Sequence, residues 1–574
     1  MDRETLDALI PLLPAPRQLE HLGSSSASIG SDPTIILTPE TMTRPAEYQL
    51  VIDRTISITA GDAEGLRCAQ ATLDQIRSLS LDNVPAIRIH DWAAFATRGF
   101  MLDVSRDRIP TMPELHALIR LLASLKFNHF QLYFEHTFAY AGHETVWKDL
   151  DPITPEQFRE LDTACQTVGI ELVAQQNCFG HLANWLRHDR YAHLAETHGP
   201  YQFNTTPPIT RTGPMSLCPI DPRSLELVTD WITQLRQTST GTLLHIGCDE
   251  TADVGAGRSG SAVDQRGLAA VYASFVSSVA GVCQSLGFRP MFWSYIALTE
   301  PAILDKLPKN LLAMAWGYEP AAPFAAWTRT LRAAGFETWV CPGTSCWRSI
   351  TGRTTERQAN IGSAARDGQA EGATGFMLTA WGDLGHRQQW PITLRALADG
   401  AQAAWADHVP ASDQAIATYV FAEQDARLVP WLDRLGDVDL ELRKANPETG
   451  RPRLHNASAM FNELHPADPN APPRGSLADW QHLQKSLEEL QSTMPMLGSP
   501  LLRQELNHTL RRAELAVQIA RLRRGEVLPL DAIERDFRAM MDEHRALWVH
   551  RARPAGLSAS LSYDEAVLMT LRSR

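Results

Sequence analysis

The chain has 574 residues, of which 44% are hydrophobic and 21% are charged. This is the composition of a globular protein, and the length predicts roughly two to four domains, because one hydrophobic core does not grow to this size. The formal net charge of −13 argues against nucleic acid as a partner, since there is no basic excess to neutralise phosphates.

The sequence predicts a cytoplasmic protein that does not span a membrane. We find no apolar run that approaches the roughly 18–20 residues of a span, and residues 1–10 are acidic, unlike a signal peptide. The eight cysteines are scattered without a Cys-x-x-Cys pair, which favours free thiols in a reducing compartment over a disulfide or zinc framework. They are Cys68, Cys165, Cys178, Cys218, Cys248, Cys283, Cys341 and Cys346.

Residues 1–92 are predicted to form a small α/β domain. Residues 65–77 have the apolar spacing of a helix, whereas β-branched runs between turn residues predict strands. The predicted strands are residues 34–38, 48–52, 56–59 and 85–90. No combination of catalytic side chains occurs here, so this domain is expected to support the rest.

Residues 93–405 alternate between strand-like and helix-like segments. The predicted strands are residues 99–104, 129–134, 170–174, 242–246, 289–293, 311–316, 337–341 and 375–381. Eight such units in one run predict a (β/α)₈ TIM barrel. An open doubly wound sheet would need a Gly-rich phosphate turn near the first strand, and none is found.

Residues 406–574 are predicted to be a C-terminal helical region. Helical periodicity covers residues 477–490, 500–523 and 531–546, after a linker rich in Pro, Asn and Gly. The helices could form a lid, pack against the barrel or form the surface of a homodimer, and the sequence leaves these alternatives open.

The adjacent carboxylates of Asp249 and Glu250 follow the strand at residues 242–246. Chemistry in such barrels collects at the carboxyl ends of the strands, where the pleat is lost and two consecutive side chains can turn toward one pocket. The alternative is that an Asp-Glu-Thr cluster simply starts a helix.

Most other strand ends bear an aromatic or hydrogen-bonding side chain. These are Arg98, which begins the first strand, and Glu135, Asn177, His181, Trp293, Trp316, Trp381 and Asp383. Indole walls with a few convergent polar groups suit a pyranose. Each of these residues also has an alternative explanation without a ligand. Each tryptophan could pack in the core, Arg98 could pair with Asp103 or Asp91, and His181 could have a structural role.

Three motifs together resemble glycoside hydrolase family 20, the β-N-acetylhexosaminidases. They are Arg-Gly-Phe-Met-Leu-Asp-Val-Ser-Arg at 98–106, Gly180-His181, and His-Ile-Gly-Cys-Asp-Glu at 245–250. The resemblance covers roughly residues 50–400, and the variants at 133–140, 178–181 and 247–250 are most similar to the intracellular hexosaminidase D type.

The resemblance implies exo-acting removal of a terminal β-linked N-acetylhexosamine, GlcNAc or GalNAc, from an oligosaccharide or glycoconjugate, without a metal or cofactor. The sugar's own acetamido oxygen would attack the anomeric carbon. Asp249 would hold the acetamide N–H and offset the oxazolinium charge, and Glu250 would act as general acid and base.

The resemblance also implies binding roles. Arg98 would bind the 3- and 4-hydroxyls with His181 nearby, the tryptophans would wall the pocket, and Asp383 would take a distal hydroxyl. Glu135, Asn177 and His245 complete the predicted substrate-binding set. Residues 341–348 lack the Tyr-x-Asp with which many members orient the acetamide, which leaves that role open.

Three alternatives remain at this stage. One is a catalytically weak carbohydrate-binding barrel, and another is a two-carboxylate retaining glycosidase in which Glu135 or Asp383 attacks. The third is a metal-dependent hydrolase with ligands from His181, His245, Asp249 and Glu250, although no His-x-His or His-Glu-x-x-His spacing is present.

Overall fold

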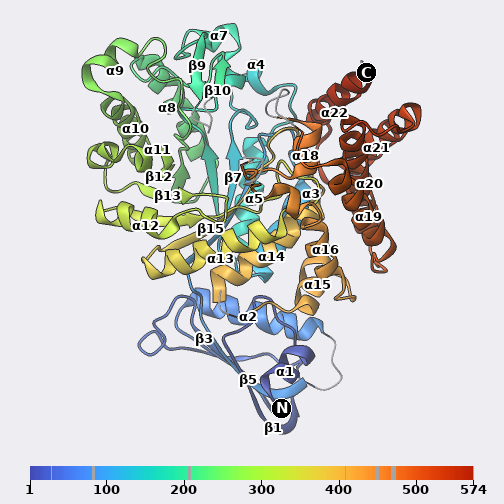
Figure 1. Cartoon of the computed structure of the whole chain (residues 1–574). Helices are drawn as coiled ribbons and strands as arrows, with labels where there is room; N and C mark the ends of the chain where they lie inside the picture. Colours follow the sequence, from blue (N-terminus) through green and yellow to red (C-terminus); the bar gives the residue numbers. More distant parts are fainter. Residues whose placement is uncertain are drawn as a thin grey trace.

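The computed structural model describes residues 1–27, 29–79, 84–203, 209–406, 409–446, 452–466 and 473–572. An N-terminal mixed sheet, a closed parallel barrel and a set of C-terminal helices follow one another along the chain (Figure 1). The predicted fold class is confirmed, while the domain boundaries at residues 92 and 405 stay predictions.

The N-terminal sheet has the strand order β1-β5-β3-β4-β2. Its strands are β1 (Gln18–Ala27), β2 (Thr34–Leu37), β3 (Tyr48–Ile52), β4 (Ile56–Ala60) and β5 (Val84–Asp91). Buried and half-buried residues alternate along β3 and β4, and α2 (Ala63–Ser78) packs against both strands. The first strand was not predicted, because its Ser-rich second half has no apolar alternation.

Eight parallel strands close the barrel in the circular order β6-β7-β8-β11-β12-β13-β14-β15. They are β6 (Thr97–Asp103), β7 (His129–Phe134), β8 (Glu171–Gln176), β11 (Leu243–His245), β12 (Arg289–Trp293), β13 (Leu312–Trp316), β14 (Glu337–Cys341) and β15 (Gly375–Ala380). The outer layer comprises α3 (Met112–Ser124), α5 (Pro155–Thr167), α8 (Pro222–Arg236), α10 (Leu268–Ser285), α12 (Phe324–Ala333), α13 (Thr354–Ala370) and α14 (Trp390–Ala406). The predicted strand count is confirmed, and Figure 1 shows the N-terminal sheet at one end of the barrel.

Helix α10 corrects one expectation, since its 18 residues are long and apolar enough to cross a membrane. Among the described residues no other helix meets that criterion. The helix belongs to the barrel's outer layer, where Val271, Val276 and Val279 are buried and where it contacts α8 and β12. All eight cysteines are buried free thiols, as expected.

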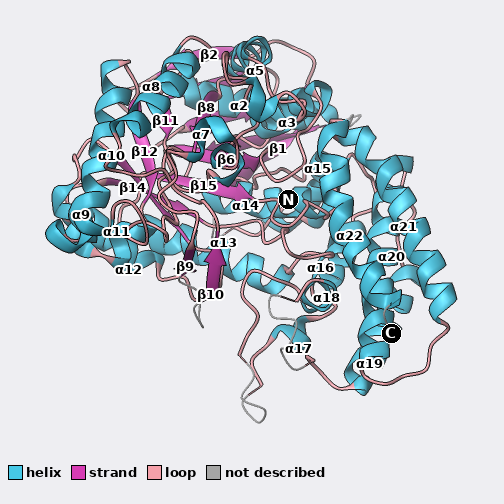
Figure 2. Ribbon diagram, turned by 90° about the horizontal axis from the view of Figure 1, so that it is seen from above, coloured by secondary structure: helices cyan, strands magenta, loops and turns pink. Residues whose placement is uncertain are grey.

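The C-terminal helices pack against one side of the barrel (Figure 2). They include α18 (Ala459–Leu464), α19 (Leu477–Ser492), α20 (Pro500–Arg523), α21 (Leu530–Arg551) and α22 (Leu557–Arg572). At the end of α21, the backbone N–H of Thr111 donates to Arg551 at 3.0 Å, and that of Arg553 donates to Ile109 at 2.8 Å. Packing against the barrel is therefore the alternative that the structure shows.

Candidate active site

The segment after β11 turns both predicted catalytic carboxylates toward one neighbour. Gly247, Cys248 and Glu250 have φ values of 67°, 67° and 47°, so the strand pleat ends there. No helix starts at Asp249, because α9 (Gly260–Arg266) begins eleven residues later. Asp249 Oδ2 and Glu250 Oε2 each lie 3.3 Å from Nε2 of His181. Both carboxylates therefore share one wall of the barrel mouth.

Two glycines allow the loops after β8 and β11 to approach this closely. A Cβ on Gly247 would lie 2.6 Å from Cγ of Asn177, and one on Gly180 would lie 2.4 Å from the Asp249 carbonyl oxygen. Neither distance is tolerated by a real Cβ, so the Gly-His and His-x-Gly motifs are requirements of this contact.

Asn177 lies behind Asp249 rather than in the open mouth. Its Nδ2 donates to Asp249 Oδ1 at 2.8 Å, and its Oδ1 accepts from the Cys248 N–H at 3.2 Å. The side chain is completely buried. Asn177 therefore fixes Asp249 and is not placed to touch a substrate, which corrects its predicted binding role.

His181 and Asp249 form an ion pair. Burial alone would lower the pKa of His181, but the Asp249 charge, with further contributions from Glu250, raises it well above its usual value. Burial likewise would raise the pKa of Asp249, and the His181 charge and the Asn177 amide instead hold it below its usual range. Asp249 is thus an ionised acceptor at neutral pH.

The two carboxylates differ in their access to solvent. The Asp249 side chain is 9% exposed, whereas that of Glu250 is 31% exposed. Asp249 therefore faces the closed interior of the mouth, and Glu250 lies at its open side, where water and a leaving group can reach it.

A second charged group surrounds Arg106, just past the end of β6. Arg106 lies 2.9 Å from Glu135 Oε1 and 3.4 Å from Asp103 Oδ2, and its guanidinium lies 4.8 Å from the ring centroid of Tyr133. Tyr133 donates its hydroxyl to Glu135 at 2.8 Å. Burial raises the pKa of Glu135, against the opposing charge of Arg106. Among the described residues, the buried Arg106 Nη1 has its ion-pair contact with Asp103 but no hydrogen bond.

Aromatic rings form the rest of the wall. The Trp381 ring packs edge-on against Tyr133 at 4.8 Å, and its Nε1 donates to the Tyr318 hydroxyl at 2.8 Å. Tyr318 stacks on Trp316 at 5.1 Å. These rings come from strands β7, β13 and β15, so the predicted convergence of strand-end aromatic residues is present.

Trp293 and His245 lie deeper than expected. Trp293 is 1% exposed and packs 4.5 Å from the His245 ring, which is fully buried. His245 Nδ1 accepts the Gly247 N–H at 3.0 Å, and burial lowers the pKa of this histidine to about 3. Both residues support the floor beneath Asp249 rather than line the opening.

Asp383 follows β15 in a loop at the mouth. Its side chain is half-buried, and no residue in the described part of the chain donates a hydrogen bond to its carboxylate. The neighbouring Gly382 N–H donates to Asp103 Oδ2 at 3.0 Å, which fastens this loop to the end of β6. Asp383 is consequently free to accept from a ligand hydroxyl.

This constellation coincides with a known catalytic domain. Residues 95–369 match the model of the glycosyl hydrolase family 20 catalytic domain. Residues 95–369 therefore resemble a glycoside hydrolase family 20 catalytic domain. The matched segment includes β6 to β14, and with them every residue of the Asp249 and Arg106 groups.

Relatives of this chain are distant. A β-N-acetylhexosaminidase of Cellulomonas fimi is 27% identical over 319 residues, covering 52% of this chain and 58% of that protein. Hexosaminidase D of Bos taurus is 28% identical over 149 residues, or 26% of this chain and 39% of its own. The chain thus spans little more than half of the first relative and less than half of the second.

Solved structures share the fold at low identity. Chitobiase of Flavobacterium johnsoniae aligns with a TM-score of 0.57 and 15% identity, covering 99% of this chain and 100% of that one. An exo β-N-acetylglucosaminidase of Vibrio harveyi, in complex with N-acetylglucosamine, aligns with a TM-score of 0.56 and 16% identity, covering 74% of this chain and 78% of that one. The first of these matches includes the C-terminal helices.

The family 20 motif at 98–106 contains two arginines, and the predicted one is not at the site. Arg98 lies at the start of β6, about 16 Å from its end at roughly 3.3 Å per residue. Its guanidinium donates to the carbonyls of Phe95, Ala96 and Lys126 and pairs with Glu64 of the N-terminal domain. Arg98 therefore joins two domains, and Arg106 is the arginine of the mouth.

Three further residues of the site were missed by sequence reasoning. Asp103 and Tyr133 are each the next-to-last residue of a predicted strand, 99–104 and 129–134, so their positions were a usable signal. Tyr318 lies two residues beyond β13, and only its contact with Trp381 reveals it.

A metal centre has no ligand set here. Within the described ranges, no group of three or more His, Cys, Asp or Glu side chains is arranged to hold a metal ion.

Proposed function

We propose that the protein is an exo-acting β-N-acetylhexosaminidase that releases terminal β-linked GlcNAc or GalNAc through attack by the substrate's acetamido oxygen. The observation that carries this proposal is that Asp249 and Glu250 share one wall and one partner, His181. Two carboxylates that act as nucleophile and acid must flank the scissile bond about 5 Å apart. Neighbours on one wall suit a mechanism in which the substrate supplies the nucleophile.

The difference in solvent exposure between the two carboxylates suits them to different roles. Asp249 is ionised and held by Asn177, which suits a fixed acceptor for the acetamide N–H and a counter-charge for the oxazolinium ring. Glu250 is the more exposed carboxylate. It would protonate the leaving oxygen and then deprotonate the incoming water.

The remaining groups would bind the sugar. The guanidinium of Arg106, whose side chain is 20% exposed, can donate to ring hydroxyls, and the carboxylate of Asp383 can accept from one. Trp381 offers a face for the apolar side of the pyranose.

Tyr318 is our candidate for the residue that orients the acetamide. Its oxygen accepts the Trp381 N–H at 2.8 Å. Burial raises the pKa of Tyr318 well above its usual value, so the hydroxyl keeps its proton. That proton could be donated to the acetamide oxygen and align it for attack.

Initial rates on nitrophenyl β-glycosides of GlcNAc, GalNAc and glucose test the proposal. We expect turnover of at least one acetamido sugar and none of the glucoside. Comparable hydrolysis of the glucoside would support the two-carboxylate alternative. Saturable binding of the acetamido sugars without turnover would support the carbohydrate-binding alternative.

A further inference from the structure

The loop that bears Asp383 has a backbone that needs outside support. Its next three residues, Leu384, Gly385 and His386, have φ values of 60°, 96° and 46°. Left-handed conformations cost free energy for the two residues with side chains and persist only where the surroundings impose them. The surroundings of this loop come from the C-terminal helices.

Helix α22 contacts the middle of this loop directly. Ser560 donates its hydroxyl to the Gly385 carbonyl at 2.5 Å. The Tyr563 ring packs against Gly385 so closely that a Cβ there would lie 2.9 Å from Tyr563 Cδ2. The loop is thus bonded and covered at the glycine between its two strained residues, Leu384 and His386.

A series of charged side chains holds the other end of the same loop. Arg387 donates through Nε to the Leu384 carbonyl at 3.1 Å, while its Nη1 lies 3.3 Å from Asp564 of α22. Asp564 in turn pairs with Arg512 of α20 at 2.7 Å. Two C-terminal helices therefore set the position of Arg387, and through it that of Leu384.

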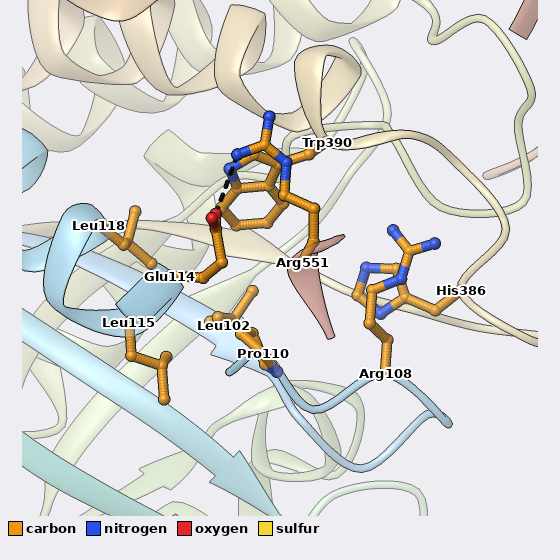
Figure 3. A pocket seen from close by; sticks show the side chains of 9 residues that line it. All are labelled: Leu102, Arg108, Pro110, Glu114, Leu115, Leu118, His386, Trp390 and Arg551. Atoms are coloured by element: carbon orange, nitrogen blue, oxygen red, sulfur yellow. Dashed lines mark hydrogen bonds and ion pairs between the residues drawn. The ribbon is translucent and has the colours of Figure 1, made fainter. Parts of the chain in front are cut away.

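The C-terminal region also holds the neighbouring loop after β6, which bears Arg106. Arg551, at the end of α21, pairs with Glu114 at 3.0 Å. Figure 3 shows this pair in a cavity that Arg108 of the β6 loop and His386 of the Asp383 loop also line. Both substrate-facing loops consequently rest on the C-terminal region, one on α22 and α20 and the other on the end of α21.

We infer that helix α22 positions Asp383 for sugar recognition, with Ser560 and Tyr563 as positioning residues. This inference rests on the proposed function, in which Asp383 accepts from a distal hydroxyl. The C-terminal helices thereby determine how the enzyme distinguishes sugars that differ at that hydroxyl. Neither residue needs to touch the substrate to do so.

The experiment compares Ser560→Ala with Ser562→Ala. Ser562 is on the same helix and is exposed, and its one side-chain hydrogen bond to the described residues goes to Ala559 of its own helix at 2.7 Å. The readout is the ratio of kcat/KM between nitrophenyl GlcNAc and its 4-epimer or 6-deoxy analogue. This ratio does not depend on the fraction of folded enzyme. Asp383→Ala identifies the substrate pair that reports on Asp383.

For that pair we expect Ser560→Ala to shift the ratio about threefold or more in the direction of Asp383→Ala, since the hydrogen bond to Gly385 is lost, together with a 3.3 Å contact to His544 inside the C-terminal region. Tyr563→Ala should do the same, and Tyr563→Phe, which keeps the ring, should not. Ser562→Ala should match the parent. A lower rate on all substrates with an unchanged ratio would show a merely structural role and would overturn the inference.

Hydrogen exchange of the backbone amides in residues 382–388 gives a readout without activity. We expect exchange about tenfold faster in Ser560→Ala than in Ser562→Ala. If the parent hydrolyses neither acetamido sugar, the proposed function fails and this measurement alone decides the positioning role. Equal exchange in both variants would overturn it.

Discussion

At the scale of single residues, the shared contact of Asp249 and Glu250 with His181 lets each carboxylate be tested separately. Glu250→Gln removes the proton donor but keeps the shape of the side chain. We expect a loss of about 10²–10⁴-fold in kcat on a natural disaccharide, and a smaller loss on a nitrophenyl glycoside, whose leaving group hardly needs the proton.

Parallel kinetics on the two substrates check this expectation. Circular dichroism of the variant controls for folding. Near-normal turnover of the disaccharide by Glu250→Gln would show that another group is the general acid.

The His181–Asp249 pair predicts how stability depends on pH. Asp249, with its lowered pKa, contributes stability above about pH 4, and this is lost as pH falls through the folded pKa. His181, with its raised pKa, contributes fully below about pH 6.5, and this is lost as pH rises through the folded pKa. The free energy of unfolding of the parent should therefore exceed that of His181→Gln by the largest amount between about pH 4 and 6.5.

Urea denaturation of both proteins from pH 3 to pH 10 measures that difference. A difference that stays constant across the whole range would contradict the ion pair.

At the scale of elements, the loop after β11 depends on a glycine that has no room for a side chain. Gly247→Ala would place a Cβ 2.6 Å from Asn177 Cγ and should displace Asp249. Gly287 is the control, because its φ of +82° is also positive but nothing lies within 4 Å of the position that a Cβ would take there. Each variant should lose about 1 kcal/mol of stability from its backbone conformation.

Only Gly247→Ala should also lose activity, by about 10²-fold, since a displacement near 1 Å is enough. Thermal unfolding and kcat/KM of both variants check the contrast. Equal activity in the two would mean that the Gly247–Asn177 contact does not position Asp249.

The strands and the loops that follow them differ in how much of their structure the sequence could predict. Regular apolar periodicity placed the barrel strands, and three of them, 129–134, 289–293 and 337–341, agree to the residue. To predict that Asp249 and Glu250 lie together at the site, it was enough to predict where one strand ends, because the two residues are adjacent in the sequence. Choosing between Arg98 and Arg106 required knowing which end of β6 faces the mouth, and finding Tyr318 required a contact between β13 and β15 that no local pattern encodes.

At the scale of the whole molecule, the barrel has one end for chemistry and one for support. The N-terminal sheet covers the end at which Arg98 pairs with Glu64 and Lys126 lies 3.4 Å from Asp91. The opposite end bears Asp249, Glu250 and Arg106. The C-terminal helices lie along the side and reach the two loops that bear Arg106 and Asp383.

Two arginines of one motif test this polarity. Arg106→Ala should lower kcat/KM of the folded enzyme by about tenfold or more, because a charge-assisted hydrogen bond to substrate is lost. Arg98→Ala should cost about 2–3 kcal/mol of stability and leave KM unchanged in the folded enzyme. The reverse pattern would place the sugar-binding arginine at the other end of the barrel.

The central claim is that the substrate's acetamido group is the nucleophile. The most direct test is the inhibition constant of a thiazoline that mimics the bicyclic intermediate, measured beside that of the product sugar. Intermediate mimics bind at least about 10²-fold more tightly than ground-state ligands, so the thiazoline should inhibit by at least that factor more strongly than the free N-acetylhexosamine. Equal inhibition by the two compounds would contradict the claim.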